Sequence, residues 1–73
     1  MKLTIESTSK IVHVNGVPAR IWEGHTASGI PVHCYITRVA VNKRENCMEF
    51  ERELQDTRPP SPELEGISLR MVL

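Results

Sequence analysis

The spacing of apolar residues along the chain predicts three antiparallel strands in its first half. Residues 10–14 (KIVHV) and residues 17–23 (VPARIWE) are rich in β-branched side chains, which favour strands. The Asn15-Gly16 pair between them predicts a two-residue type I′ hairpin, because both turn positions need a positive φ. Residues 24–29 (GHTASG) then predict a second turn, and residues 30–41 (IPVHCYITRVAV) a third strand that is long enough to bend midway. The expected unit is a three-stranded meander.

A helix is predicted after the meander, where the pattern changes its period. Asn42 and Glu45 have the spacing of a capping box, which starts a helix. Apolar side chains then recur on one helical face as far as residue 55, at Cys47, Phe50 and Leu54. The opposite side is mostly acidic and is expected to face solvent.

The two ends of the chain carry weaker patterns. Residues 1–9 alternate at Leu3 and Ile5, which fits either a short extra strand or an arm. Residues 56–65 are rich in proline and predict a rigid connection. Residues 67–73 (ISLRMVL) alternate again and predict a final strand, whose neighbour is either the first or the third strand.

These elements predict the α+β class in a single small domain spanning residues 1–73. A chain of 73 residues suffices for one domain and is too short for two. The expected architecture is an antiparallel three- to four-stranded meander, with one helix packed on one face and a C-terminal strand.

The hairpin also predicts which side chains share a face of the sheet. The two-residue turn places Val14 opposite Val17 and Lys10 opposite Ile21. If Gly24 and Gly29 bracket a four-residue loop, the helix-covered core face carries Val12, Val14, Val17, Ala19, Ile21, Val32, Cys34 and Ile36. The other face then carries Ile11, His13, Pro18, Arg20, Trp22, His33 and Tyr35. A second turn longer by one residue would exchange the two faces of the third strand.

Composition narrows the choice of partner. Hydrophobic residues make up 40% of the chain and charged residues 25%, as in ordinary folded domains. Nine basic and nine acidic residues give a formal net charge of zero. This argues against nucleic acid or an anionic membrane as the main partner and allows self-association, as in a homodimer. The sequence has neither a secretory leader nor a long apolar run, so we expect a cytoplasmic protein with reduced thiols and no membrane contact.

The best candidate binding surface is the face that bears the single Trp and the single Tyr. Aromatic and arginine side chains are enriched at protein-binding hot spots, which favours a non-enzymatic protein-binding or regulatory module. Stacking of bases on the same side chains, with nucleic acid as the ligand, is the alternative. A third reading is a face whose aromatics only pair across strands. The candidate binding residues are His13, Arg20, Trp22, His33, Tyr35 and Arg38.

Catalytic and metal chemistry find little support in the sequence. Adjacent strand residues point to opposite faces, so His33 does not readily pair with Cys34, which is expected in the core. His13 and His33 lie about 10 Å apart across the predicted sheet, too far for one metal ion without His25 or a second chain. The loop of residues 24–29 lacks the lysine and the helix start of a phosphate site. We therefore expect no enzyme activity, no metal and no cofactor.

The stretches VNGVPARIWEG and GIPVHCYITR, with FEREL and the later PPSPELEGISLRMVL, resemble small accessory proteins of tailed phages and prophages. The resemblance covers most of the chain, and none of its motifs carries a known chemistry. It implies a short accessory product in a bacterial cytoplasm, rather than a structural protein of the virion. Such a product is expected to bind a host or defence protein.

Overall fold

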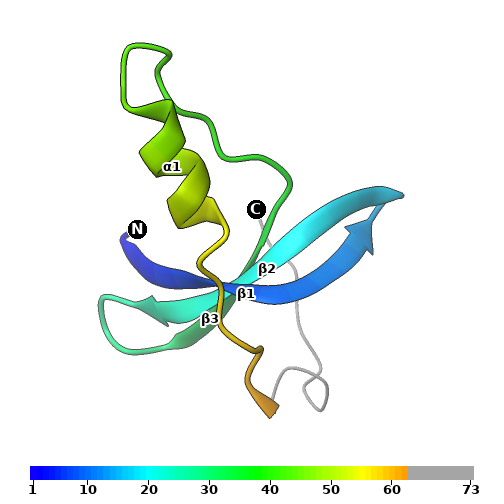
Figure 1. Ribbon diagram of the computed structural model, residues 1–73. Helices are drawn as coiled ribbons and strands as arrows, with labels where there is room; N and C mark the ends of the chain where they lie inside the picture. Colours follow the sequence, from blue (N-terminus) through cyan, green and yellow to red (C-terminus); the bar gives the residue numbers. More distant parts are fainter. Residues whose placement is uncertain (63–73) are drawn as a thin grey trace.

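A computed structural model describes residues 1–62 and contains a three-stranded sheet and one helix (Figure 1). The strands are β1 (Leu3–Val14), β2 (Val17–Thr26) and β3 (Pro31–Ile36), antiparallel in the order β1-β2-β3. The helix α1 spans Cys47–Leu54. This confirms the α+β class and the antiparallel meander. The strand expected at residues 67–73 lies outside the described residues.

The first hairpin forms as its sequence predicts. Asn15 and Gly16 both have positive φ, at 52° and 80°, which is the conformation that a type I′ turn requires. Val14 pairs with Val17 and Val12 with Ala19. The local chemistry of the turn is therefore enough to fix this register.

β1 is one long strand with an irregularity in the middle. Ser7 pairs with Trp22 and Ile11 with Arg20, so three residues of β1 stand opposite Ile21 alone. The expected pairing of Lys10 with Ile21 does not form. Thr8 fills the interruption, because its hydroxyl donates to the Ile21 carbonyl at 2.7 Å and accepts from the Lys10 amide at 3.3 Å. A fully buried side chain thus replaces the missing backbone pairing.

Replacing this hydroxyl by a methyl group should weaken the fold. We expect Thr8→Val to lower the free energy of unfolding by about 1–3 kcal/mol, because the shape is kept and a buried carbonyl loses its donor. Chemical denaturation measures this change. Thr4→Val, at an exposed position of the same strand, is the control. Equal stability of the two variants would contradict a structural role for the Thr8 hydroxyl.

The proline-rich segment after α1 is attached to the outer edge of β1. The Ser9 amide donates to the Arg58 carbonyl at 2.9 Å, and the Arg58 amide donates to the Ser7 carbonyl at 3.2 Å. These bonds make a single parallel bridge between Thr8 and Arg58. Pro59 has no N–H to continue a ladder. The expected rigid connection therefore also serves as an edge contact of the sheet.

The register of β3 differs from the prediction by an odd number of residues. β2 continues to Thr26, because the N-terminal part of β1 pairs with it, and the turn follows this longer strand. Ile21 consequently pairs with Tyr35 instead of Val32. A shift of three residues exchanges the two faces of a strand. His33 and Tyr35 therefore share a face with Ile21, while Cys34 shares a face with Trp22.

The helix begins four residues later than predicted, although the motif is of the predicted kind. Asn46 is the N-cap, and its side chain accepts from the Glu49 amide at 3.0 Å. The Asn-x-x-Glu spacing of Asn42 and Glu45 is thus repeated at the true start. Asn42 instead stabilises a turn, with its side chain accepting from the Arg44 amide at 2.9 Å.

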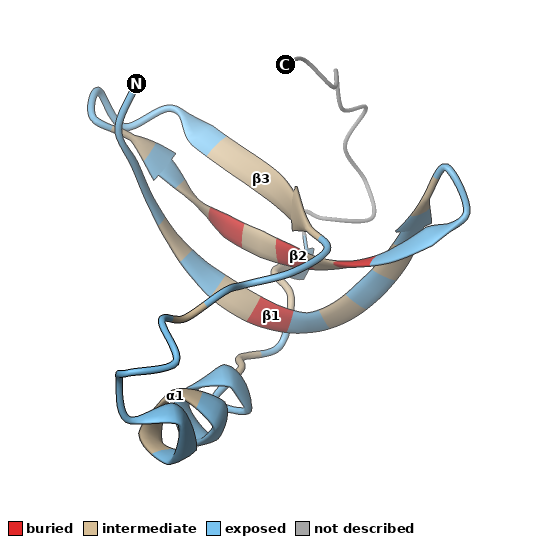
Figure 2. Ribbon diagram, turned by 90° about the horizontal axis from the view of Figure 1, so that it is seen from above, coloured by how far each residue is buried: buried red, intermediate tan, exposed pale blue. Residues whose placement is uncertain are grey.

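The buried residues lie on the sheet and not under the helix (Figure 2). Ala19, Ile21 and Glu23 are buried along β2, together with Thr8 of β1. No residue of α1 is buried, and Leu54 lies on the side of Trp22. The expectation that α1 covers the Ala19 and Ile21 face is wrong. Figure 1 shows the chain after α1 running past β1 to the opposite side of the sheet. Within residues 1–62, no helix is long and apolar enough to span a membrane.

Candidate functional site

The structure divides the predicted binding face into two groups. Trp22 pairs with Cys34 and Arg20 with Ile36, whereas Tyr35 pairs with Ile21. The side chains of paired residues share a face, so the two aromatics lie on opposite sides of the sheet. The expected single aromatic face is therefore wrong. His13 and Arg20 stay on the Trp22 side, and His33 lies on the Tyr35 side.

A proline opens a groove on the Trp22 side of the sheet. Every second residue of β2 directs its backbone N–H and C=O toward β3, and Arg20 is one of these residues. Pro18 lies two positions before Arg20, so it would be the next residue to pair with β3. Pro18 has no N–H to donate, so the pairing ends at Arg20 and Ile36. The following residues 37–39 leave the sheet and lead toward α1, as the green trace in Figure 1 shows.

This groove has a volume of about 260 Å³ and mixes apolar and basic side chains. We call it the Trp22 groove. Its lining residues are Ile11 of β1, residues 18–20 and Trp22 of β2, residues 36–39 and Leu54 of α1. The apolar side chains at its rim are exposed, at 46% for Ile11 and 36% for Leu54. Such an open cluster is typical of an interaction surface, because solvated apolar groups gain by being covered.

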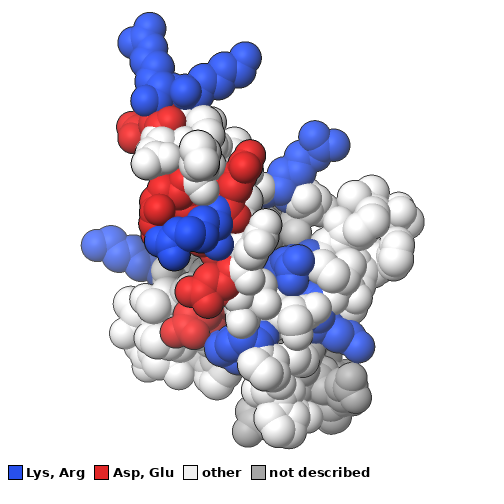
Figure 3. Space-filling view, in the orientation of Figure 1, with Lys and Arg blue, Asp and Glu red and all other residues white. Residues whose placement is uncertain are grey.

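Two arginines are the only ionisable residues among residues 1–62 that line the groove. The Arg20 guanidinium donates to the Thr8 carbonyl at 2.9 Å, which holds it in place and leaves other N–H donors for a ligand. Arg38 is exposed, and no hydrogen bond or ion pair holds its side chain within the described part of the chain. Acidic side chains gather elsewhere, over α1 and the chain that follows it (Figure 3). The groove is therefore a basic surface on a chain of zero net charge.

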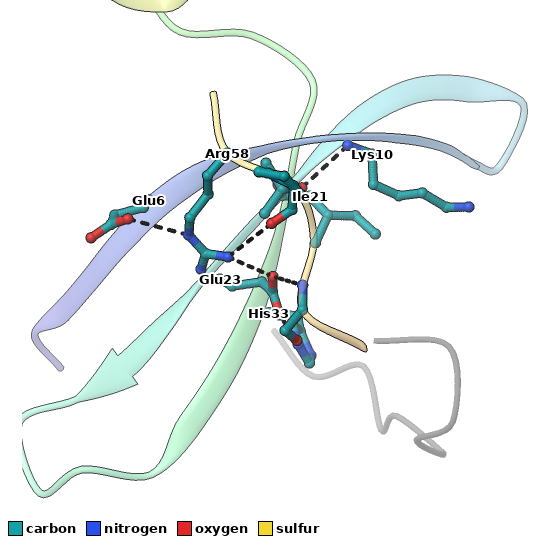
Figure 4. Close-up of polar contacts among 9 residues, drawn as sticks. Glu6, Lys10, Ile21, Glu23, His33 and Arg58 are labelled. Carbon is teal, nitrogen blue, oxygen red and sulfur yellow. Dashed lines mark hydrogen bonds and ion pairs between the residues drawn. The ribbon is translucent and has the colours of Figure 1, made fainter. Parts of the chain in front are cut away.

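The opposite side of the sheet holds a buried carboxylate, Glu23, at the centre of a polar cluster (Figure 4). Its Oε1 accepts from Arg58 Nη1 at 3.1 Å and from the Ser61 amide at 2.8 Å. Its Oε2 accepts from His33 Nε2 at 3.1 Å and from Ser61 Oγ at 2.6 Å. Arg58 also bonds Glu6 through Nε at 3.2 Å. We call Glu6, Glu23, His33, Arg58 and Ser61 the Glu23 cluster.

The cluster keeps the Glu23 carboxylate charged. Burial opposes this by raising the pKa, but hydrogen bonds from Ser61, His33 and Arg58 outweigh it and lower the pKa of Glu23 from 4.5 to about 2. An ionised carboxylate only accepts, so His33 Nε2 carries the hydrogen of its bond. Four accepted bonds use about all the lone-pair sites that a carboxylate offers.

This arrangement differs from a nucleophilic triad. In a triad the serine bonds to the histidine, which removes its proton. Here Ser61 Oγ and His33 Nε2 both bond to the same oxygen of Glu23. The carboxylate thus holds the segment after α1 against the sheet, and Ser61 and His33 each bond to Glu23 in place of a serine–histidine bond.

The sequence contains one signal for Glu23 that the strand prediction did not use. Glu23 continues the alternation Ala19, Ile21 onto the buried face. A carboxylate on the apolar face of a strand requires hydrogen-bonding or charged partners, because an unpaired buried charge lowers stability. Its partners Arg58 and Ser61 are more than thirty positions away. Only the fold brings them together.

The described part of the chain gives no geometric support for a metal site or a disulfide. Within residues 1–62, no group of three or more His, Cys, Asp or Glu side chains is placed to hold a metal ion. Neither Cys34 nor Cys47 is in a disulfide; Cys34 is half-buried and Cys47 is exposed. Cys34 was expected in the core with Ala19, and the flip of β3 places it beside Trp22 instead.

Comparison with known proteins adds no further constraint. No protein-family model matches the chain, and no curated protein or solved structure matches it.

Proposed function

We propose that this protein is a small non-enzymatic module that binds a protein partner through the Trp22 groove. The observation that carries the proposal is the exposed apolar rim of this groove, at Ile11, Val39 and Leu54, around a half-buried tryptophan. Tryptophan and arginine are the residues most enriched at binding hot spots, and both line the groove.

The other polar feature of the molecule favours a structural role over catalysis. The Glu23 carboxylate already accepts four hydrogen bonds from its own chain. These donors use its lone-pair sites, and a pKa lowered to about 2 makes the carboxylate a weak base. This supports a module without enzyme activity.

The nucleic-acid alternative loses much of its basis through the flip of β3. Base stacking along a strand of nucleic acid needs several aromatic side chains on one surface, and Tyr35 lies on the face opposite Trp22. The net charge of zero also provides little attraction for phosphates. The resemblance to phage and prophage accessory proteins supports a host or defence protein in the bacterial cytoplasm as the partner.

A matched pair of double variants tests the role of the groove. Ile11→Ser with Leu54→Ser removes two exposed apolar residues from its rim. Ile30→Ser with Leu3→Ser changes the same two residue types at exposed positions outside the groove. Such exposed substitutions usually alter stability by only about 0.5 kcal/mol, which thermal melting checks.

We expect proteins from a bacterial lysate to be retained by the wild-type chain and by the Ile30/Leu3 variant, and lost with the Ile11/Leu54 variant. Quantitative mass spectrometry of the retained fractions measures this difference. Identical retained fractions for both double variants would contradict binding through the Trp22 groove.

A further inference from the structure

We propose that the Trp22 groove binds a short peptide segment in which an apolar side chain lies next to a carboxylate. This inference rests on the proposed protein-binding function and specifies the chemistry of its partner. Both halves of the ligand follow from what lines the groove.

The apolar half follows from the size and the walls of the groove. Pockets for whole small molecules span about 300–1,000 Å³, and this groove measures about 260 Å³. It therefore suits one or two side chains better than a cofactor. Trp22, Ile36 and Leu54 contribute apolar walls from a strand of the sheet, the end of β3 and the helix. An aliphatic or aromatic side chain would cover all three.

The carboxylate half follows from the two arginines. Arg20 is already fixed by its bond to the Thr8 carbonyl, so it loses little side-chain freedom when it binds a ligand. Arg38 is exposed at the same groove. A guanidinium offers a planar pair of N–H donors, which matches the two oxygens of a carboxylate. With no acidic residue in the lining, a carboxylate ligand meets no repulsion inside the groove.

The acidic helix predicts a direction for the bound segment. Leu54 brings the C-terminal end of α1 to the groove, and the exposed Glu53 and Asp56 are its close neighbours in sequence. Those carboxylates would repel an acidic group of the ligand that lies near them, whereas Arg20 and Arg38 would attract it. We therefore expect the carboxylate of the ligand beside the two arginines and away from Glu53 and Asp56.

Selection from a random peptide library on the immobilised wild-type chain tests this chemistry. We expect enrichment of peptides with Leu, Ile, Phe or Trp beside Asp or Glu, and no enrichment on the Ile11→Ser, Leu54→Ser variant. An enriched peptide is then labelled and titrated by fluorescence anisotropy. Its binding should weaken with added salt and on changing the carboxylate to an amide.

Three arginine variants measure the role of the guanidinium. Arg38→Glu should weaken binding of the enriched peptide by about tenfold or more, through loss of a charge-assisted pair and like-charge repulsion. Arg38→Lys keeps the charge but loses the planar fork, and should weaken it by about threefold. Arg44→Glu makes the same charge reversal outside the groove and should leave binding unchanged.

The outcomes separate this inference from the function on which it rests. Enriched peptides that need the groove but carry no acidic residue would contradict the proposed carboxylate in the ligand. The proposed protein-binding function of the groove would still stand. No groove-dependent peptide, together with identical lysate fractions for the two double variants, would overturn both. Two further results would also contradict a peptide as the ligand of the groove. One is a wild-type dimer in light scattering that is absent in the Ile11/Leu54 variant. The other is tight groove-dependent binding of single-stranded DNA.

Discussion

Glu23→Gln should remove much of the stability of this domain. The glutamine amide replaces one acceptor by a donor, while Arg58, His33 and two donors of Ser61 still point at the site. Buried donors that lose their acceptor cost about 1–3 kcal/mol each, so we expect a loss of about 2–4 kcal/mol. A domain of this size has only about 5 kcal/mol to lose. Urea denaturation, followed by the fluorescence of Trp22, measures the change.

Glu6→Gln is the matched control for this substitution. Glu6 makes the same kind of bond to Arg58, but its side chain is 75% exposed. Exposed ion pairs contribute about 0.2–1 kcal/mol, so the control should stay close to the wild type. If the free energy of unfolding falls by the same small amount in both variants, the Glu23 cluster does not stabilise the fold in the way described.

The same cluster predicts how stability depends on pH. The pKa of Glu23 is lowered from 4.5 to about 2 in the folded protein, so the folded state favours the ionised carboxylate. The stabilisation is present above pH 4.5 and is lost as the pH falls from 4.5 through 2. The pKa difference corresponds to at most about 3 kcal/mol. Denaturation curves between pH 7 and pH 2 should show this fall in the wild type and a smaller one in Glu23→Gln.

Gly24→Ala should lower the free energy of unfolding at least as much as Glu23→Gln does, because the added methyl group would collide with backbone atoms. Gly24 pairs with Ile5 of β1 and with Val32 of β3, in the middle of the sheet. A methyl group at this position would overlap the carbonyl oxygen of Thr4. The two strands would have to separate, which should cost about 3 kcal/mol or more. Chemical denaturation, and protease resistance where the variant unfolds, measure the loss.

Gly29→Ala serves as the control for the glycine substitution. Gly29 has a φ of 88°, but nothing lies within 4 Å of the added methyl group. Its cost is therefore the strain of a left-handed backbone alone, about 1–2 kcal/mol. A Gly29 variant as unstable as the Gly24 variant would contradict the close approach of β1 at Gly24.

Local chemistry made much of the sheet predictable. The Asn15-Gly16 turn needs two positive φ angles, which few sequences tolerate, and it fixed the pairing of the first hairpin. Pro18 has no N–H to donate, and in the structure the pairing of β2 with β3 reaches only as far as Arg20, two residues after it. The helix was predictable as an element, but two Asn-x-x-Glu motifs compete for its start, and only the second caps it.

The candidate site was predictable only in part, because the register of strand pairing decides which side chains share a face of the sheet. Arg20, Trp22 and Arg38 do line one groove, but His33 belongs to the Glu23 cluster and Tyr35 to the opposite face. The deciding event is the pairing of residues 3–6 with the end of β2, which lengthens that strand and moves the second turn. No local pattern encodes it.

The sequence by itself determined the α+β class and the first hairpin, since each depends on neighbouring residues and on backbone chemistry. Only the tertiary structure decided which side chains meet. The three-residue shift of β3 separated Tyr35 from Trp22, and the return of the chain along β1 brought Arg58 and Ser61 to Glu23. The physical reason is that contacts between distant residues depend on strand register and chain path, which the whole sheet sets together.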